Sequence, residues 1–219
     1  MAKTSDSKRF SEDLRKTILQ KRAQVSLNQW KDLGRSGIQR VLGSRYGSRL
    51  LNQPRVLLGM YSALADEPSL EILEELAVQE SKIHLFYPRI ESVKEKKMSL
   101  VKMPSRMNAE DWVAGAYGIR EPHPSQAAAD EEMLQALDLI FVPSVVLGER
   151  GERWGRGAGY YDRFLPLLPQ AIRVTFAFEF QLVQELKQEA WDQGVDWIFT
   201  ESREIQGPQF LEKWKLILK

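Results

Sequence analysis

The residues best suited to chemistry lie in one short stretch, ERGERWGRGAGYYDRFLP at 149–166. Gly155, Gly157 and Gly159 favour neither a helix nor a strand, because glycine loses more backbone entropy on folding than any other residue. A sharp turn, or a ligand that lies against bare main chain, would compensate for this cost. Arginines stand among the glycines, so the pattern predicts that the ligand is an anion.

The position of this stretch sharpens the prediction. It follows a buried strand expected at 137–143, and a helix begins inside it at about Gly159, so it belongs at the carboxyl edge of a sheet, where open α/β folds bind ligands. Backbone N–H groups and a helix N-terminus can bind phosphate there, with Arg153 and Arg156 adding charge. Asp162 could hold a magnesium ion that also contacts phosphate, since hard cations prefer oxygen ligands. The spacing matches neither GxGxxG nor GxxxxGK[ST], so a phosphate-binding loop of another type is predicted.

The elements that must position this loop are indicated by alternating strand and helix patterns. Such an alternation predicts βαβ units with a parallel sheet covered on both faces. We expect a single three-layer α/β/α domain over residues 1–219 with a mixed, mainly parallel sheet. A basic first helix with Ser11 as N-cap should pack across the sheet and reach the loop, and residues 102–132 should form a long connection over the sheet's edge. The expected strands are 55–61, 82–88, 137–143, 171–178 and 195–200, and the expected helices are 11–25, 29–42, 69–80, 159–168 and 181–190.

Composition excludes several classes of function. The 219 residues include 31 basic and 30 acidic ones and no cysteine, which rules out a disulfide framework and any cysteine-ligated metal site. A net charge of +1 provides no field for attracting nucleic acid. No apolar run approaches the roughly 20 residues that span a bilayer. We therefore expect a cytoplasmic protein that binds neither nucleic acid nor a membrane. Independently of composition, we also expect a monomer that acts on a small-molecule substrate.

The loop WGRGAGYYDRFL closely resembles the signature RLGRGxGYYDRxL of the 5-formyltetrahydrofolate cyclo-ligases, also called 5,10-methenyltetrahydrofolate synthetases. The resemblance continues over nearly the whole chain and implies a Rossmann-like fold of the NagB/RpiA/CoA-transferase type. Further segments that are similar to the family are DLRKTILQKR, ADEPSLEIL, KIHLFYPR, YGIREP, DLIFVP and AWDQGVDWIFTE.

This resemblance implies a reaction in which ATP and Mg²⁺ drive the conversion of 5-formyltetrahydrofolate to 5,10-methenyltetrahydrofolate, with release of ADP and phosphate. It implies catalytic roles for Arg156, Tyr160 and Asp162, and a magnesium site at Asp162 and Asp192. The residues implied to bind ATP are Arg15, Arg153, Trp154, Gly155, Arg156, Gly157, Ala158, Gly159, Tyr160 and Tyr161. Those implied to bind the folate are Glu67, Tyr117, Arg156, Gly157, Ala158, Gly159 and Tyr160.

Each of these assignments has a purely structural alternative. Asp162 could simply favour the first turn of a helix through the helix dipole. Asp192 could be a turn residue, and Arg15 could belong to a solvated helix face. Glu67 could lead into a helix, and Tyr117 could pack in the core.

Some positions depart from the family pattern. Ser11 replaces a lysine, Ser144 a glycine and Gly148 an aspartate, while Trp154 stands where leucine is usual. Ala158 must occupy a backbone conformation that an L-residue tolerates. These departures motivate an alternative function, a paralogue that binds folate or a nucleotide without cyclising it. A third possibility, nucleic-acid binding through the basic first helix, lacks a recognition motif.

Overall fold

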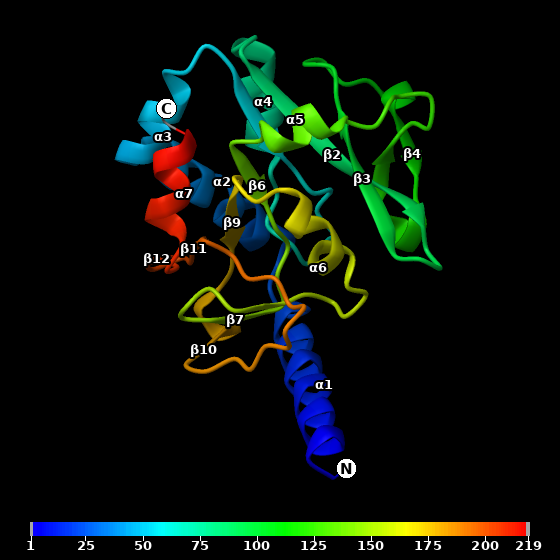
Figure 1. The fold of residues 1–219 in the computed structure, drawn as a ribbon, viewed down its shortest axis with the longest axis vertical. Coiled ribbons are helices and arrows are strands. Elements are labelled where there is room, and N and C mark those ends of the chain that lie inside the picture. The colour runs from blue at the N-terminus through cyan, green and yellow to red at the C-terminus, as the bar shows by residue number, and fades with distance from the viewer. Residues whose placement is uncertain (1, 218–219) are drawn as a thin grey trace.

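The computed structural model describes the backbone of residues 2–217 and the side chains of residues 10–217. Its centre is a seven-stranded sheet with the order β12-β11-β9-β6-β1-β2-β3 (Figure 1). Its strands are β1 (Val56–Gly59), β2 (Ile83–Ser92), β3 (Lys97–Lys102), β6 (Leu139–Phe141), β9 (Ile172–Phe176), β11 (Trp197–Phe199) and β12 (Glu204–Gln206). The inner strands run parallel, whereas β3 and β12 pair antiparallel at the edges. The predicted mixed, mainly parallel sheet is confirmed.

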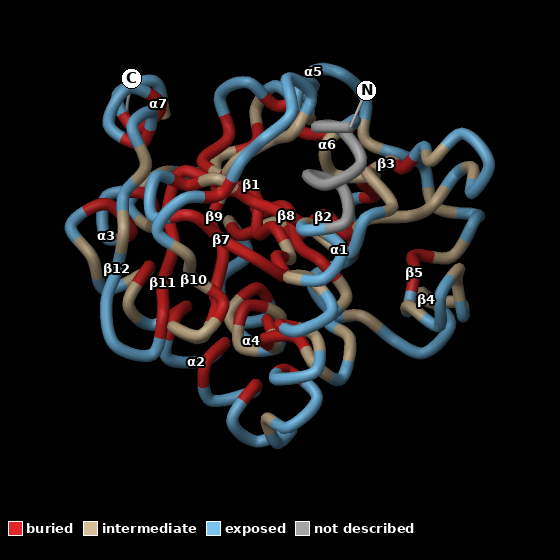
Figure 2. Tube along the Cα trace, turned by 90° about the horizontal axis from the view of Figure 1, so that it is seen from below, coloured by how far each residue is buried: buried red, intermediate tan, exposed pale blue. Residues whose placement is uncertain are grey.

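The two faces of this sheet carry separate hydrophobic cores, because successive strand residues point to opposite sides. In β1, Val56 and Leu58 belong to one core and Leu57 to the other. Figure 2 shows the inner strands as buried segments within largely exposed loops and helices. The predicted three layers are confirmed. Helices α2 (Leu27–Gly43), α3 (Arg45–Leu51), α4 (Glu71–Gln79) and α7 (Phe210–Ile217) cover the first core, and α5 (Glu131–Gln135) and α6 (Tyr160–Phe164) cover the second.

Helix α1 (Ala2–Arg22) packs against a small second sheet, so the expectation that it crosses the main sheet is wrong (Figure 1). Ile18 of the helix is buried with Val146 and Trp154 of the small sheet. The helix also begins before the predicted N-cap Ser11, in a segment that contains no proline or glycine to stop it. The small sheet has the order β10-β7-β8, with β7 (Val146–Gly148), β8 (Arg153–Trp154) and β10 (Leu182–Val183).

The helix predicted at 181–190 is wrong, because tertiary contacts hold this segment extended. Leu182 and Val183 form β10, which pairs parallel with β7. The buried amide of Gln181 donates to the carbonyls of Ser144 at 3.2 Å and Val145 at 3.1 Å. The indole of Trp154 donates to the Lys187 carbonyl at 3.1 Å. These hydrogen bonds hold the segment against the small sheet, although its sequence pattern favours a helix.

Other elements agree with or extend the prediction. The helices expected at 29–42 and 69–80 are confirmed as α2 and α4, and the segment 102–132 contains an unpredicted hairpin beside β2. Within residues 2–217, none of the helices has the length and apolar character needed to span a bilayer. The hairpin is β4 (Trp112–Ala114) with β5 (Arg120–Pro122), and the 3₁₀ turns are Ala109–Asp111, Ala116–Gly118, Leu165–Leu167 and Glu179–Gln181.

Candidate functional site

A cleft lies at the carboxyl edge of the sheet, where the strand order reverses between β1 and β6. The chain leaves β1 towards β2 on one side and leaves β6 towards β9 on the other, and such a switch point is where open α/β sheets bind ligands. The cleft has a volume of about 2020 Å³. It brings together every predicted site residue, namely Arg15, Glu67, Tyr117, all residues from Arg153 to Asp162, and Asp192.

The glycines of the loop adopt backbone conformations that other residues rarely adopt. Gly157 has φ of 100° and Gly159 has φ of 76°. Gly159 caps α6, and a Cβ at this position would lie 2.6 Å from a guanidinium nitrogen of Arg163. Ala158 is not among the described non-glycine residues with positive φ, as the sequence requires. The glycines therefore serve the turn that aims the start of α6 at the cleft.

Asp162, in the first turn of α6, is held by the loop that it follows. Its Oδ1 accepts hydrogen bonds from Arg153 at 2.6 Å and from the backbone N–H of Gln193 at 3.2 Å. Arg153 is buried and also donates to the Gln193 carbonyl at 3.0 Å. Burial lowers the pKa of Arg153 while Asp162 raises it. Because its donors are directed to protein acceptors, Arg153 orients Asp162; its contact with phosphate stays a prediction.

The two predicted metal-binding carboxylates lie on adjoining segments. Asp192 directly precedes Gln193, whose N–H contacts Asp162, and Asp192 Oδ2 accepts from the N–H of Glu189 at 2.9 Å. In the described part of the chain no group of three or more His, Cys, Asp or Glu residues could hold a metal ion. Mg²⁺ is commonly bound by one or two carboxylates together with substrate phosphates and water. A pair of carboxylates beside the predicted phosphate-binding loop fits that chemistry.

Arg15 reaches the loop from α1, as predicted. Its Nε donates to the Gly155 carbonyl at 3.1 Å, and its guanidinium lies 5.0 Å from the centre of the Trp154 ring. Trp154 is buried in the small sheet, and its ring packs against the guanidinium of Arg15. Arg15 is therefore a fixed part of the cleft wall and not a freely solvated side chain.

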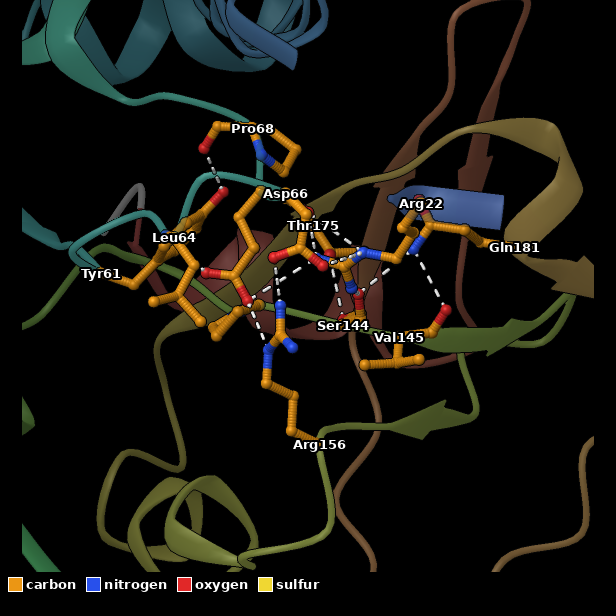
Figure 3. Close-up of polar contacts among 12 residues, drawn as sticks. Arg22, Tyr61, Leu64, Asp66, Pro68, Ser144, Val145, Arg156, Thr175 and Gln181 are labelled. Carbon is orange, nitrogen blue, oxygen red and sulfur yellow. Dashed lines mark hydrogen bonds and ion pairs between the residues drawn. The ribbon is translucent and has the colours of Figure 1, made fainter. Parts of the chain in front are cut away.

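Four charged residues form a network at the inner end of the cleft, between the segments that follow β1 and β6 (Figure 3). Arg156 donates to Glu67 Oε1 at 3.2 Å and also bonds Asp66. Arg22 lies behind them, with ion pairs of 3.4 Å to Asp66 and 3.7 Å to Glu67. The sequence analysis did not identify Arg22 or Asp66. A signal was present, because Arg22 follows Arg15 by two helical turns and so lies on the same face of α1.

Three tyrosines, Tyr117, Tyr160 and Tyr161, form the aromatic side of the cleft. Tyr117 is 63% exposed on the rim, so the core-packing alternative is wrong, and its ring meets that of Tyr160 edge-on at 6.3 Å. Tyr117 has φ of 60°, a conformation that costs energy for a non-glycine residue. Burial, assisted by Tyr117, raises the pKa of Tyr160 to about 12. Burial likewise raises the pKa of Tyr161, so both can donate hydrogen bonds at neutral pH.

Glu121 is a further cleft residue that the sequence analysis did not single out, although it lies in the YGIREP segment. One carboxylate oxygen accepts from the N–H of Ile90 at 3.1 Å. The other is buried and has no hydrogen-bond partner among the described residues. A buried oxygen without a partner can accept a hydrogen bond from a bound molecule.

Two departures from the family pattern have local structural reasons. A Cβ at Gly148 would lie 2.2 Å from a carboxylate oxygen of Glu152, so glycine leaves room for this side chain. The Ser144 hydroxyl accepts a hydrogen bond from Thr175 at 3.0 Å, and its carbonyl accepts one from Arg22 at 2.9 Å. Gly148 thus gives space to Glu152, and the Ser144 side chain provides an acceptor for the buried Thr175 hydroxyl.

Comparisons with known proteins identify relatives of this chain. The chain is 41% identical over 76 residues to the mitochondrial 5-formyltetrahydrofolate cyclo-ligase of Arabidopsis thaliana, which is 32% of this chain and 27% of the plant protein. It is 34% identical over 94 residues to the 5-formyltetrahydrofolate cyclo-ligase of Mycolicibacterium smegmatis, which is 42% of this chain and 47% of the relative. The matched part thus spans less than two-thirds of either relative.

A solved structure extends the likeness to the whole fold. The NMR structure of Aquifex aeolicus 5,10-methenyltetrahydrofolate synthetase superposes with a TM-score of 0.71 at 27% identity, covering 89% of this chain and 91% of that one. The model of the 5-formyltetrahydrofolate cyclo-ligase family matches residues 7–201. Sequence, cleft and fold therefore lead to one conclusion: the chain belongs to the 5-formyltetrahydrofolate cyclo-ligase family.

Proposed function

We propose that the chain cyclises 5-formyltetrahydrofolate to 5,10-methenyltetrahydrofolate, consuming ATP in the presence of Mg²⁺ and releasing ADP and phosphate. The observation that carries this proposal is the single cleft at the switch point. It unites the complete glycine-rich loop with Glu67, Tyr117 and the two carboxylates Asp162 and Asp192.

The proposed chemistry needs charge stabilisation and positioning more than covalent catalysis. The formyl oxygen of the folate attacks the terminal phosphorus of ATP, and ADP leaves. The second folate nitrogen then attacks the activated formyl carbon and releases its proton to solvent, the ring closes, and the carbon–oxygen bond breaks as phosphate departs. Phosphoryl transfer of this kind is accelerated by aligning the reactants and neutralising the transferred group.

The residues of the cleft suit these tasks. The positive-φ turn at Gly157 and Gly159 would leave main chain open to phosphate oxygens. Arg156, with its guanidinium at the cleft surface, would neutralise the transferred group, and the Tyr160 hydroxyl would donate to it. Glu67 and Tyr117 would hold the folate ring.

Asp162 and Asp192 would hold Mg²⁺. The ion, when bound, would neutralise phosphate charge and orient the phosphate chain. The contribution of this chain is the placement of the carboxylates, which Arg153 and the Gln193 N–H fix for Asp162.

A turnover assay tests the proposal directly. Purified protein is mixed with 5-formyltetrahydrofolate and magnesium ATP, and the methenyl product absorbance and ADP release are followed together. We expect equal amounts of both products. ADP without the methenyl product would indicate a different phosphoryl acceptor. Folate binding by calorimetry with neither product would favour the non-catalytic paralogue.

We further propose that the protein acts as a cytoplasmic monomer on its small-molecule substrate and binds no nucleic acid. The near-neutral charge supports the last point. Light scattering of the purified protein and titration with mixed RNA and DNA at low salt test these statements.

A further inference from the structure

Arg22 is a fully buried arginine immediately behind the cleft. It ends α1, its relative exposure is 1%, and it is not among the residues that line the cleft. A bound substrate would therefore not touch it. A buried charge is costly unless it is well paired and hydrogen-bonded, so its contacts indicate what it does.

Those contacts join the segments that follow the two central strands. Nε donates to the carbonyl of Asp66 at 3.0 Å, and a second nitrogen bonds the same carbonyl. Nη1 donates to the carbonyl of Ser144 at 2.9 Å. Asp66 follows β1 and Ser144 follows β6, so one guanidinium bridges the switch point (Figure 3). The planar fork of arginine can do this, whereas a lysine ammonium cannot reach both carbonyls with the same geometry.

The same guanidinium supplies countercharge to the acidic pair. Its ion pairs with Asp66 and Glu67 raise its pKa against the lowering effect of burial. Glu67 is 7% exposed, and its second carboxylate oxygen accepts from the N–H of Leu64 at 3.1 Å. Glu67 is thus held from behind by Arg22 and by its own turn.

Arg156 completes the network from the opposite, open side. Its side chain is 38% exposed, against 1% for Arg22. Arg156 is therefore the cation of the network that can turn towards a ligand, and Arg22 is the one that must stay.

We propose that Arg22 is a positioning residue for Glu67. It fixes the turn that carries Glu67 and retains the carboxylate's countercharge when Arg156 turns from the acidic pair to phosphate. This inference rests on the proposed function, in which Glu67 contacts donors of the folate ring and Arg156 contacts phosphate.

The first experiment compares steady-state kinetics of R22K and R22Q with the wild-type protein. Loss of the bridge should raise KM for 5-formyltetrahydrofolate about tenfold and leave kcat within about threefold. The lost contact stabilises the bound substrate and the transition state equally, so its removal affects KM more than kcat. KM for ATP should stay within about twofold. R40Q is the matched control: Arg40 donates to the Thr200 carbonyl at 2.7 Å and lies away from the cleft. It should leave both constants unchanged.

A double-mutant cycle separates positioning from general support of the fold. If Arg22 acts through Glu67, E67Q should itself raise the folate KM, and R22Q should add less than about twofold in the E67Q background. Independent effects that multiply would overturn the proposal, as would equal losses for folate and ATP. If R22Q does not fold, R22K in the same cycle decides, since it keeps the charge and loses the bridge.

The proposal and the proposed function fail differently. Absence of turnover in the wild-type protein would refute the function. Calorimetric titration of the wild type, R22K and R40Q with 5-formyltetrahydrofolate then still tests the positioning role. Selective weakening of folate binding in R22K supports it, and unchanged binding overturns it.

Discussion

Two ionic clusters in this molecule bury positive charge in different ways. Behind the cleft, Arg22 shares Asp66 and Glu67 with the partly exposed Arg156. At the other cluster, Lys213 of α7 pairs with Asp196 alone at 2.6 Å, and both side chains are buried. Asp196 Oδ2 also accepts from the N–H of Arg173 at 2.8 Å, and Lys213 also donates to the Ala171 carbonyl at 3.3 Å.

The difference lies in what each cluster leaves open. The Lys213–Asp196 pair is closed: both partners are buried, and their further bonds go to backbone groups at the start of β9. The cleft network includes a cation at the surface, and Glu121 adds a buried oxygen that has no hydrogen-bond partner among residues 10–217. We infer that the closed pair fixes α7 on the sheet, whereas the open network is arranged for an incoming ligand.

The strongest test of the closed pair removes its cation. Lys213→Met removes the hydrogen-bonded counter-ion of the buried Asp196 carboxylate, which should lower the free energy of unfolding by about 3–5 kcal/mol. Urea denaturation measures the loss, and the activity of the folded protein should be unchanged. The double variant Lys213→Met, Asp196→Asn also lacks the negative charge, and the amide oxygen can still accept from the Arg173 N–H. It should regain part of the lost stability. A loss below about 1 kcal/mol would contradict the assignment of a stabilising role.

In the cleft, the corresponding change is Asp162→Asn. The amide oxygen can still accept from Arg153 and the Gln193 N–H, so the fold should persist, but the anionic metal ligand is lost. We expect kcat to fall at least about a hundredfold, since a bound metal ion contributes several kcal/mol to transition-state stabilisation. Glu152→Gln is the control, a carboxylate of the same loop that does not line the cleft. An unchanged rate for Asp162→Asn would refute the metal site.

Asp138 is a partly buried carboxylate, and it extends the comparison to a group with no cation within hydrogen-bonding distance among the described residues. Asp138 accepts from the N–H of Leu57 at 2.7 Å, and burial raises its pKa from 3.8 to about 6. The folded chain therefore binds more protons than the unfolded chain between these values, and the free energy of unfolding should fall as pH rises through this window. The shift corresponds to about 3 kcal/mol at most.

Asp138→Asn removes this titration. Denaturation of the variant and the wild type at several pH values from about 4 to 7 should show the variant gaining about 1–3 kcal/mol relative to the wild type as pH rises. Parallel stability curves would show that Asp138 titrates normally.

The smallest expected effect concerns Ser144, whose carbonyl accepts a hydrogen bond from Arg22. Ser144→Gly restores the residue usual in the family but leaves the buried Thr175 hydroxyl without its acceptor at 3.0 Å. We expect about 1 kcal/mol of lost stability and unchanged kinetic constants, because Arg22 bonds the backbone carbonyl and not the side chain. Thermal melting and the turnover assay measure both. A large change in folate KM would place the serine side chain in the binding function.

Sequence patterns predicted the central strands and the loop because those signals are local. Apolar runs such as that of β1 mark buried strands, and the residue types at 153–162 identify the loop. The pattern at 181–190 failed, since Gln181 and Lys187 are held by the small sheet, which no local pattern indicates. The edge strand β3 and helix α7 were missed for a related reason: short elements at the margins are stabilised by packing more than by propensity.

The sequence by itself determined the family, the fold class and the residues of the glycine-rich loop, because residue types and turn glycines are fixed along the chain. Only the tertiary structure decided that α1 packs on the small sheet, that Arg153 orients Asp162, and that Arg22 bridges the ends of β1 and β6. Arg22 lies 44 residues from Asp66 and 122 from Ser144. Contacts of such long separation depend on how the layers pack. The spacing of Arg15 and Arg22 places both on one face of α1, but it does not indicate that Arg22 will be buried.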